Sequence, residues 1–310
     1  MKAGGYFERV VIGRSWLMRS QFVGMVMPTI RNPLEWGTDQ LRHAASHVAS
    51  SGRSVSGARQ SQGAQILSID MADLKDALMK GLDDFRACRT DVVFLCIIYP
   101  IVGLVLARFA FDYDMLPLLF PAASGFALLG PVAAVGLYEM SRRREQGLDA
   151  RWSHAFDIVR SPAFIPILLL GLLLLVLFLV WLAVAQAIYM MTLGPTPPVS
   201  AGLFIRDVLT TSSGWLMISI GMGVGFAFAL SVLAISVVSF PLLLDREVGL
   251  GSAVATSMRV FAENPLPIAA WGVIVAGGLA IGSIPAFLGL VFVMPVLGHA
   301  TWHLYRKTVA

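Results

Sequence analysis

Charged residues are scarce in this chain. Only 14% of its 310 residues are Asp, Glu, Lys or Arg and 57% are hydrophobic, against roughly 25% and 45–50% in an average soluble domain. The mean hydropathy is +0.76, and the apolar residues stand in long runs. This composition excludes a soluble enzyme, a disordered chain and a disulfide-stapled secreted scaffold, and it leaves a polytopic membrane protein.

Cysteine is also nearly absent, since Cys88 and Cys96 are the only two. They lie eight residues apart on one predicted helix, or about 12 Å at the rise of an α-helix. A disulfide needs Cα atoms within about 7 Å, so the two cannot pair. No Cys-x-x-Cys spacing is present to suggest a metal site.

The apolar runs predict an all-α fold with six transmembrane helices. A helix of about 20 residues spans the hydrocarbon core of a bilayer. The predicted spans cover residues 92–111, 115–138, 164–190, 215–244, 266–283 and 286–305. The last two come from one apolar block that Gly282-Ser283-Ile284-Pro285 divides into a hairpin.

The charge distribution predicts the orientation of these spans. Most of the 23 basic residues fall before the first span, in the 139–163 and 245–265 loops, or at the C-terminus. The opposite loops hold only Arg206, and Arg108 near the end of the first span can pair with Asp112 or Asp114. Lys and Arg are retained on the cytoplasmic side. We therefore expect a multi-pass protein of the inner (cytoplasmic) membrane with both termini in the cytoplasm, and no nucleic-acid partner.

Residues 1–71 differ from the rest and are predicted to be a largely disordered cytoplasmic tail, with the six-helix domain at 72–310. Small polar residues dominate 44–65, which is typical of disorder. Residues 30–42 are either a short interfacial helix or part of this tail. Met25 and Met27 are alternative starts that would leave residues 1–26 untranslated.

An internal repeat predicts how the six spans are grouped. Arg-Glu-x-Gly-Leu occurs at 144–148 and again at 246–250. An apolar stripe typical of an amphipathic helix follows each copy, and a looser stripe precedes the first span. The stripes consist of Trp152, Ala155, Phe156 and Val159; of Val254, Met258 and Phe261; and of Leu74, Leu78, Leu82 and Phe85. These stripes predict three parallel units, each an interfacial helix followed by a transmembrane hairpin. The units either enclose a substrate path or result from simple duplication.

Two residue patterns in the spans predict close helix packing. Each second hairpin arm contains a proline, which frees a carbonyl that neighbouring helices must satisfy; these are Pro131, Pro241 and Pro295. Gly221, Gly223 and Gly225 predict that the fourth span approaches a partner closely.

Chemistry-bearing residues are few. His299 and His303 share a helix face, so they could hold a metal or serve as haem ligands, or they could join Trp302 and Tyr305 in an interfacial aromatic belt. Because the hairpin supplies no third ligand, we expect neither metal nor cofactor. His43 and His47 have the same spacing beside the tail.

The predicted span interiors contain no Asp, Glu, Lys or Arg, which disfavours proton-coupled transport. Glu139 and Asp245 are predicted to form ion pairs with Arg142–Arg144 and Arg246 at helix ends. No Ser-His-Asp set, His-Glu-x-x-His motif or paired carboxylates are present, so the sequence disfavours an enzyme.

Several stretches resemble the bacterial predicted integral membrane proteins known as domain of unknown function 2189. They are DLKDALMKGLDDFRACRTDVVFLCIIYPIVGLVLARFAF, FALLGPVAAVGLYEMSRRREQGL, VVSFPLLLDREVGL and PVLGHATWHLYRK, and together they cover about residues 70–308. The resemblance implies a membrane location and transfers no site residues.

The favoured hypothesis is a structural, scaffold or lipid-interacting membrane protein, with a homo-oligomer or another membrane protein as a further partner. Basic clusters on the cytoplasmic side suit anionic headgroups, and Arg142, Arg143, Arg144 and Arg151 are the predicted contacts. Two alternatives remain. One is a permease for a small neutral or amphiphilic solute, which would use the proline-broken helices and the serines predicted to lie deep in the spans, Ser124, Ser219, Ser231 and Ser236. The other is a metal- or haem-binding respiratory accessory subunit.

Overall fold

The computed structural model describes residues 65–88, 96–97, 100–101, 103–105, 108, 116–128, 130–194, 198 and 200–310, which all belong to the unit Val48–Ala310. Within these ranges the helices are joined by turns and irregular segments, and the one β-type contact is an isolated antiparallel bridge between Ile66 and Val309, so the predicted all-α fold is confirmed. The predictions for residues 1–64, and those for Asp112 and Asp114, lie outside the described residues.

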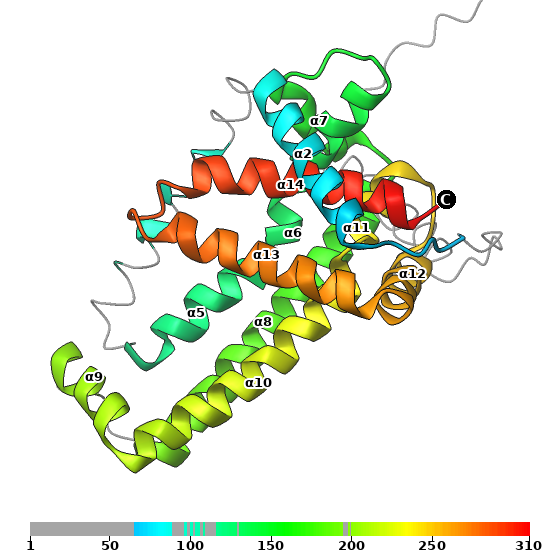
Figure 1. The fold of residues 1–310 in the computed structure, drawn as a ribbon. Helices are drawn as coiled ribbons and strands as arrows, with labels where there is room; N and C mark the ends of the chain where they lie inside the picture. The colour runs from blue at the N-terminus through cyan, green and yellow to red at the C-terminus, as the bar shows by residue number, and fades with distance from the viewer. Residues whose placement is uncertain are drawn as a thin grey trace, which may run out of the picture. The chain divides into compact units, whose positions relative to one another are not determined.

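Three long apolar segments of the described chain could cross a membrane: Phe164–Thr192, Ser212–Asp245 and Pro265–Ser283. The first is helix α8 and the third is α13, while the second comprises α10 (Ser212–Ser236) and α11 (Ser239–Asp245). They correspond to the predicted spans 164–190, 215–244 and 266–283. Helices α8 and α10 lie side by side (Figure 1) and are connected through α9 (Ala201–Thr210). Helix α8 is apolar on all its sides and most of its residues are exposed, which is typical of a helix in lipid.

The predicted spans 115–138 and 286–305 differ from the structure. Residues 115–138 fall in three helices, α5 (Leu116–Leu128), α6 (Gly130–Ala133) and the start of α7 (Val135–Glu145). The last helix, α14 (Leu290–Thr308), starts four residues late because 284–289 form a turn with two left-handed residues, Ala286 and Phe287. Most of the predicted span 92–111 lies outside the described residues, so six spans stay a prediction.

Three shorter helices pack against the long ones: α2 (Met71–Ala87), the 3₁₀ helix η1 (Trp152–Arg160) and α12 (Leu250–Glu263). Helix α2 lies across α14 (Figure 1), η1 packs on α7, and α12 packs on α10 and α11. Helices α7, α11 and α14 also contact one another. We call the region around the C-terminal ends of these three helices, Glu145, Asp245 and Thr308, together with α2, η1 and α12, the basic end.

The predicted apolar stripes of these short helices are only partly correct. In η1, Ala155 and Ile158 are buried while Val159 is 59% exposed, because a 3₁₀ helix places residues i and i+3 on one face. In α12, Met258 is 52% exposed. The buried face of α12 consists instead of Ala253, Ser257 and Val260.

Helix α2 buries Leu74 and Phe85, as predicted, together with the small residues Ala77 and Gly81. A Cβ atom added at Gly81 would lie 2.6 Å from the backbone nitrogen of Ala300. The missing side chain therefore lets α2 and α14 approach closely.

The described end of the predicted tail runs alongside the C-terminus. Leu67 donates its backbone N–H to the carbonyl of Thr308 at 3.0 Å. The Asn264 side chain accepts from the Ile69 N–H at 2.9 Å and donates to the Leu67 carbonyl at 3.2 Å. Residues 65–70 thus tie the start of α2 to α14 and to the start of α13.

The glycines of the fourth predicted span do not all mark a helix contact. A Cβ added at Gly225 would lie 3.0 Å from the Trp181 ring, whereas at Gly221 and Gly223 it would meet nothing described within 4 Å. The prediction of close approach is correct only for Gly225.

Candidate functional site

A buried polar cluster joins three helices at the basic end. Asp84 comes from α2, Ser141 and Arg144 from α7, and His299 and His303 from α14. Asp84, Ser141 and His299 are 5%, 1% and 1% exposed, so the centre of the cluster is removed from solvent. Arg144 is the most exposed member, and its guanidinium pairs with Oδ1 of Asp84.

Hydrogen bonds order the protons in this cluster. Oδ2 of Asp84 accepts from the Ser141 hydroxyl at 2.6 Å and lies 2.9 Å from Nε2 of His303. Because Ser141 has one hydroxyl proton and gives it to Asp84, its oxygen must accept from Nδ1 of His299, 2.7 Å away. His299 is then the Nδ1–H tautomer, and its Nε2 makes no hydrogen bond with a described residue.

Asp84 is the anionic centre of the cluster. Burial raises the pKa of its carboxyl, but the hydrogen bonds from His303 and Ser141 outweigh burial, and the pKa lies below its ordinary value. Asp84 is therefore ionised at neutral pH and binds both α7 and α14. The cluster can hold three helices together, and its buried centre offers no route for a substrate.

The structure corrects the interpretation of His299 and His303 as part of an aromatic belt. Trp302 and Tyr305, the other members of that belt, are buried at 1% and 0% exposure. The described residues contain no group of three or more His, Cys, Asp or Glu suited to a metal ion. The two imidazoles bond to Ser141 and Asp84 instead.

Sequence reasoning missed Asp84 because it lies 219 positions from His303. The search for a third polar partner was confined to the hairpin that carries the histidines. One signal was available, since Asp84 falls on the same face of α2 as Leu74, Ala77 and Gly81. An acidic residue on a helix face that is otherwise buried requires a partner from another element.

The four arginines predicted to contact headgroups all form ion pairs within the chain. Arg142 and Arg143 both bind Glu139, and Arg143 also binds Asp157 of η1 at 2.8 Å. Arg144 binds Asp84, and Arg151, the most exposed at 70%, binds Asp149. The structure therefore brings Arg142 and Arg143 together and leaves Arg151 apart. The predicted pairing of Glu139 is confirmed for Arg142 and Arg143, whereas Arg144 binds Asp84 instead.

A second network joins the ends of α7, α11 and α14. Arg306 binds Glu145 at 3.0 Å and Asp245 at 3.4 Å. The Tyr305 hydroxyl donates to Asp245 at 2.7 Å, and the Trp302 indole N–H donates to Glu145 at 2.9 Å. The predicted pairing of Asp245 with Arg246 is present at 3.9 Å.

The deep serines bond to their own helices. Ser219, Ser231 and Ser236 each donate to the carbonyl four residues earlier, at 2.7–2.8 Å. Ser124 donates to the Pro121 carbonyl three residues earlier. Each of these four hydroxyls gives its proton to a carbonyl of its own helix.

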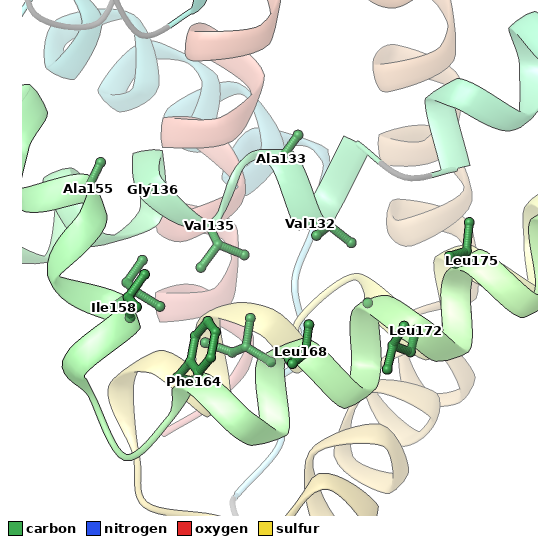
Figure 2. A pocket seen from close by; sticks show the side chains of 13 residues that line it. Val132, Ala133, Val135, Gly136, Ala155, Ile158, Phe164, Leu168, Leu172 and Leu175 are labelled. Carbon is green, nitrogen blue, oxygen red and sulfur yellow. The ribbon is translucent and has the colours of Figure 1, made fainter. Parts of the chain in front are cut away.

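An apolar groove of about 530 Å³ lies between α6–α7, η1 and α8 (Figure 2). All 13 residues that line it are apolar or glycine. Val132 and Val135 point toward α8 (Figure 2), where Leu168 and Leu172 are almost half exposed. The volume is within the range of about 300–1,000 Å³ for small-molecule sites. The groove can take an apolar chain but has no polar group to orient a polar solute.

Comparisons with known proteins agree with a membrane location. Residues 119–245 match the family described as "Predicted integral membrane protein", domain of unknown function 2189, and the resemblance seen in the sequence is confirmed over that range. No curated protein and no solved structure matches the chain. The chain is an integral membrane protein with helices able to span a membrane.

Proposed function

We propose that this chain is a structural protein of a bacterial inner membrane that binds anionic headgroups of the cytoplasmic leaflet through α2, η1 and α12. Both termini and the basic end would face the cytoplasm. Arg142–Arg144 and Arg151 would contribute positive charge beside these helices, although each must share its charge with a carboxylate of the chain.

One observation carries this proposal. Each short helix exposes an apolar side chain close to a cation: Met79 at 57%, Val159 at 59% and Met258 at 52%. Lys75 lies one turn before Met79, while Arg160 and Arg259 directly follow Val159 and Met258. Lys75 and Arg160 form no ion pair with a described residue, and Arg259 has only an exposed pair with Glu263, which stabilises little. Apolar side chains beside cations favour the boundary between headgroups and acyl chains.

The helix packing supports the predicted arrangement in three units. Helix η1, which begins the second unit, packs on α7 of the first, and α12 of the third packs on α11 of the second. Helix α2 of the first unit packs on α14 of the third. In the proposed architecture the units form a closed ring, and the Asp84 cluster is the contact that closes it.

Fluorescent labels on single cysteines test the interfacial position. Cys88 and Cys96 are first replaced by alanine, and the full chain is reconstituted into vesicles that contain nitroxide lipids. We expect labels at Met79→Cys, Val159→Cys and Met258→Cys to be quenched by lipids carrying the nitroxide near the headgroup.

Matched controls lie at exposed polar positions on other faces of the same α-helices, Lys80→Cys on α2 and Ser252→Cys on α12, about 100° and about 120° around the axis from Met79 and Met258. These labels should be quenched by aqueous iodide more strongly than by the lipids. Equal quenching of both sets by iodide would refute an interfacial position. Replacing Lys75, Arg160 and Arg259 together by glutamine should lower the amount of anionic lipid that copurifies, whereas Arg206→Gln should not.

A further inference from the structure

We propose that the apolar groove between α6–α7, η1 and α8 binds one acyl chain of an anionic phospholipid from the surrounding leaflet, with Arg160 on its phosphate. The site deepens the proposed function, because it names one lipid position among the general headgroup contacts. It is a binding site, whereas the exposed Met79 and Met258 would make only surface contacts.

The shape and chemistry of the groove favour a hydrocarbon chain. Every lining residue is apolar or glycine, and the volume is about 530 Å³. Gly171 of α8 lines the groove, and Val132 of α6 points toward α8 (Figure 2). A polar solute would lose its hydrogen bonds to water here and gain none, whereas an acyl chain gains contact with both walls.

The charges at the rim favour an anionic headgroup. Val159 lines the groove, and Arg160 follows it at the end of η1. Asp157 of η1 is paired with Arg143 of α7 at 2.8 Å, so these two charges neutralise each other. Arg160 is exposed and forms no ion pair with a described residue. It is therefore the rim cation that a phosphate would meet without displacing a carboxylate.

The position of the groove fits a lipid of the bilayer. It lies against the first turns of α8, a helix long and apolar enough to span a membrane. The exposed fractions of Leu168, Leu172 and Leu175 are 45%, 48% and 38%, so the groove opens along the lipid-facing side of α8. A phospholipid can enter it sideways without leaving its leaflet.

Filling the groove provides the test. A Cβ added at Gly171 would lie 3.5 Å from Val132, an ordinary contact, so Gly171→Ala should be tolerated while Gly171→Leu occupies the groove. The full chain is purified in mild detergent, and native mass spectrometry counts the bound phosphatidylglycerol and phosphatidylcholine. We expect one phosphatidylglycerol on the wild type and on Gly171→Ala. Gly171→Leu should bind it at least about ten-fold more weakly, the effect of about two excluded methylenes.

Arg160→Gln should reduce the preference for phosphatidylglycerol over phosphatidylcholine and leave one lipid bound. Equal retention by Gly171→Leu and Gly171→Ala would overturn the site. If Gly171→Leu fails to fold, Leu172→Trp fills the groove from its exposed side and is judged by the same criterion. Labels at Met79→Cys and Met258→Cys should be quenched equally with and without Gly171→Leu. If Gly171→Leu loses the lipid while the labels stay quenched, the effect belongs to the groove. If the labels are not quenched while the lipid stays bound to the wild type, the proposed interfacial position fails and the groove does not.

Discussion

Nε2 of His303 lies 2.9 Å from Oδ2 of Asp84, although 219 positions separate the two residues. The contact joins the first described helix to the last. Asp84 also binds Arg144 and Ser141, so a single carboxylate connects α2 with both α14 and α7. The cluster is the point where the two ends of the membrane domain are held together.

Removing the charge of Asp84 should destabilise the protein strongly. Asp84→Asn leaves Arg144 without its anion and removes a charged acceptor from His303 and Ser141. Because Arg144 is 41% exposed, solvent screens its pair with Asp84. We therefore expect a loss of about 1.5–3 kcal/mol, the range for hydrogen bonds to a charged group. Thermal unfolding of the full chain in detergent, followed by circular dichroism, measures the loss. The adjacent Asp83→Asn is the control, because Asp83 forms only an exposed pair with Arg86. A similar unfolding midpoint for both variants would contradict the assigned role of Asp84.

Acid should weaken the same connection. The pKa of Asp84 lies below its ordinary value, because hydrogen bonds from His303 and Ser141 outweigh the effect of burial. A lowered carboxyl pKa stabilises the folded state above the unfolded-state value of about 3.9, and the contribution is lost as the pH falls through the folded-state pKa. Unfolding midpoints measured from about pH 7 to about pH 3 should fall more steeply for the wild type than for Asp84→Asn. Parallel curves would show that Asp84 does not contribute to the acid sensitivity.

Hydropathy and charge spacing are sufficient to predict the helices and the ion pairs whose partners lie close together in the sequence. A run such as 164–190 must be a helix in lipid because its backbone has no other hydrogen-bond partners there. The ion pair between Glu139 and Arg142, three residues apart, likewise follows from helix geometry. Both features follow from residues a few positions apart, so they can be predicted without knowing which helices pack together.

Contacts between distant helices could not be predicted in this way. The aromatic residues Trp302 and Tyr305 have the pattern of a membrane belt, yet both are buried and donate to Glu145 at the end of α7 and Asp245 at the end of α11. The partners of the α14 histidines, Asp84 on α2 and Ser141 on α7, lie 219 and 158 positions away from them in the sequence. The prediction of close helix contact at the glycines is similarly incomplete. A Cβ added at Gly225 would meet Trp181, while at Gly221 and Gly223 it would meet no described atom within 4 Å. Sequence alone does not say which glycine faces a neighbour.

The contact between α2 and α14 should be intolerant of added volume at Gly81. A Cβ there would lie 2.6 Å from the Ala300 nitrogen and 2.7 Å from the Val296 carbonyl oxygen, and rotating a side chain cannot relieve contacts with backbone. Gly81→Ala should therefore lower the stability by about 1–3 kcal/mol, measured by thermal unfolding in detergent. Gly202→Ala on α9, where nothing described lies within 4 Å, should not destabilise. Equal midpoints for Gly81→Ala and the wild type would argue against the close approach of these helices.

The turn between α13 and α14 should be relieved by a glycine. Ala286 has a φ angle of 50°, in the left-handed region that costs an L-residue about 1–2 kcal/mol, whereas glycine adopts it freely. Part of the gain is offset by the greater entropy of glycine in the unfolded chain, so Ala286→Gly should stabilise by about 0.5–1 kcal/mol. Ala255→Gly is the control at an exposed position inside α12, where the same replacement should destabilise by about 1 kcal/mol. The test is the sign of the two changes in unfolding midpoint. If both variants unfold earlier than the wild type, Ala286 is not held in a left-handed conformation in the folded protein.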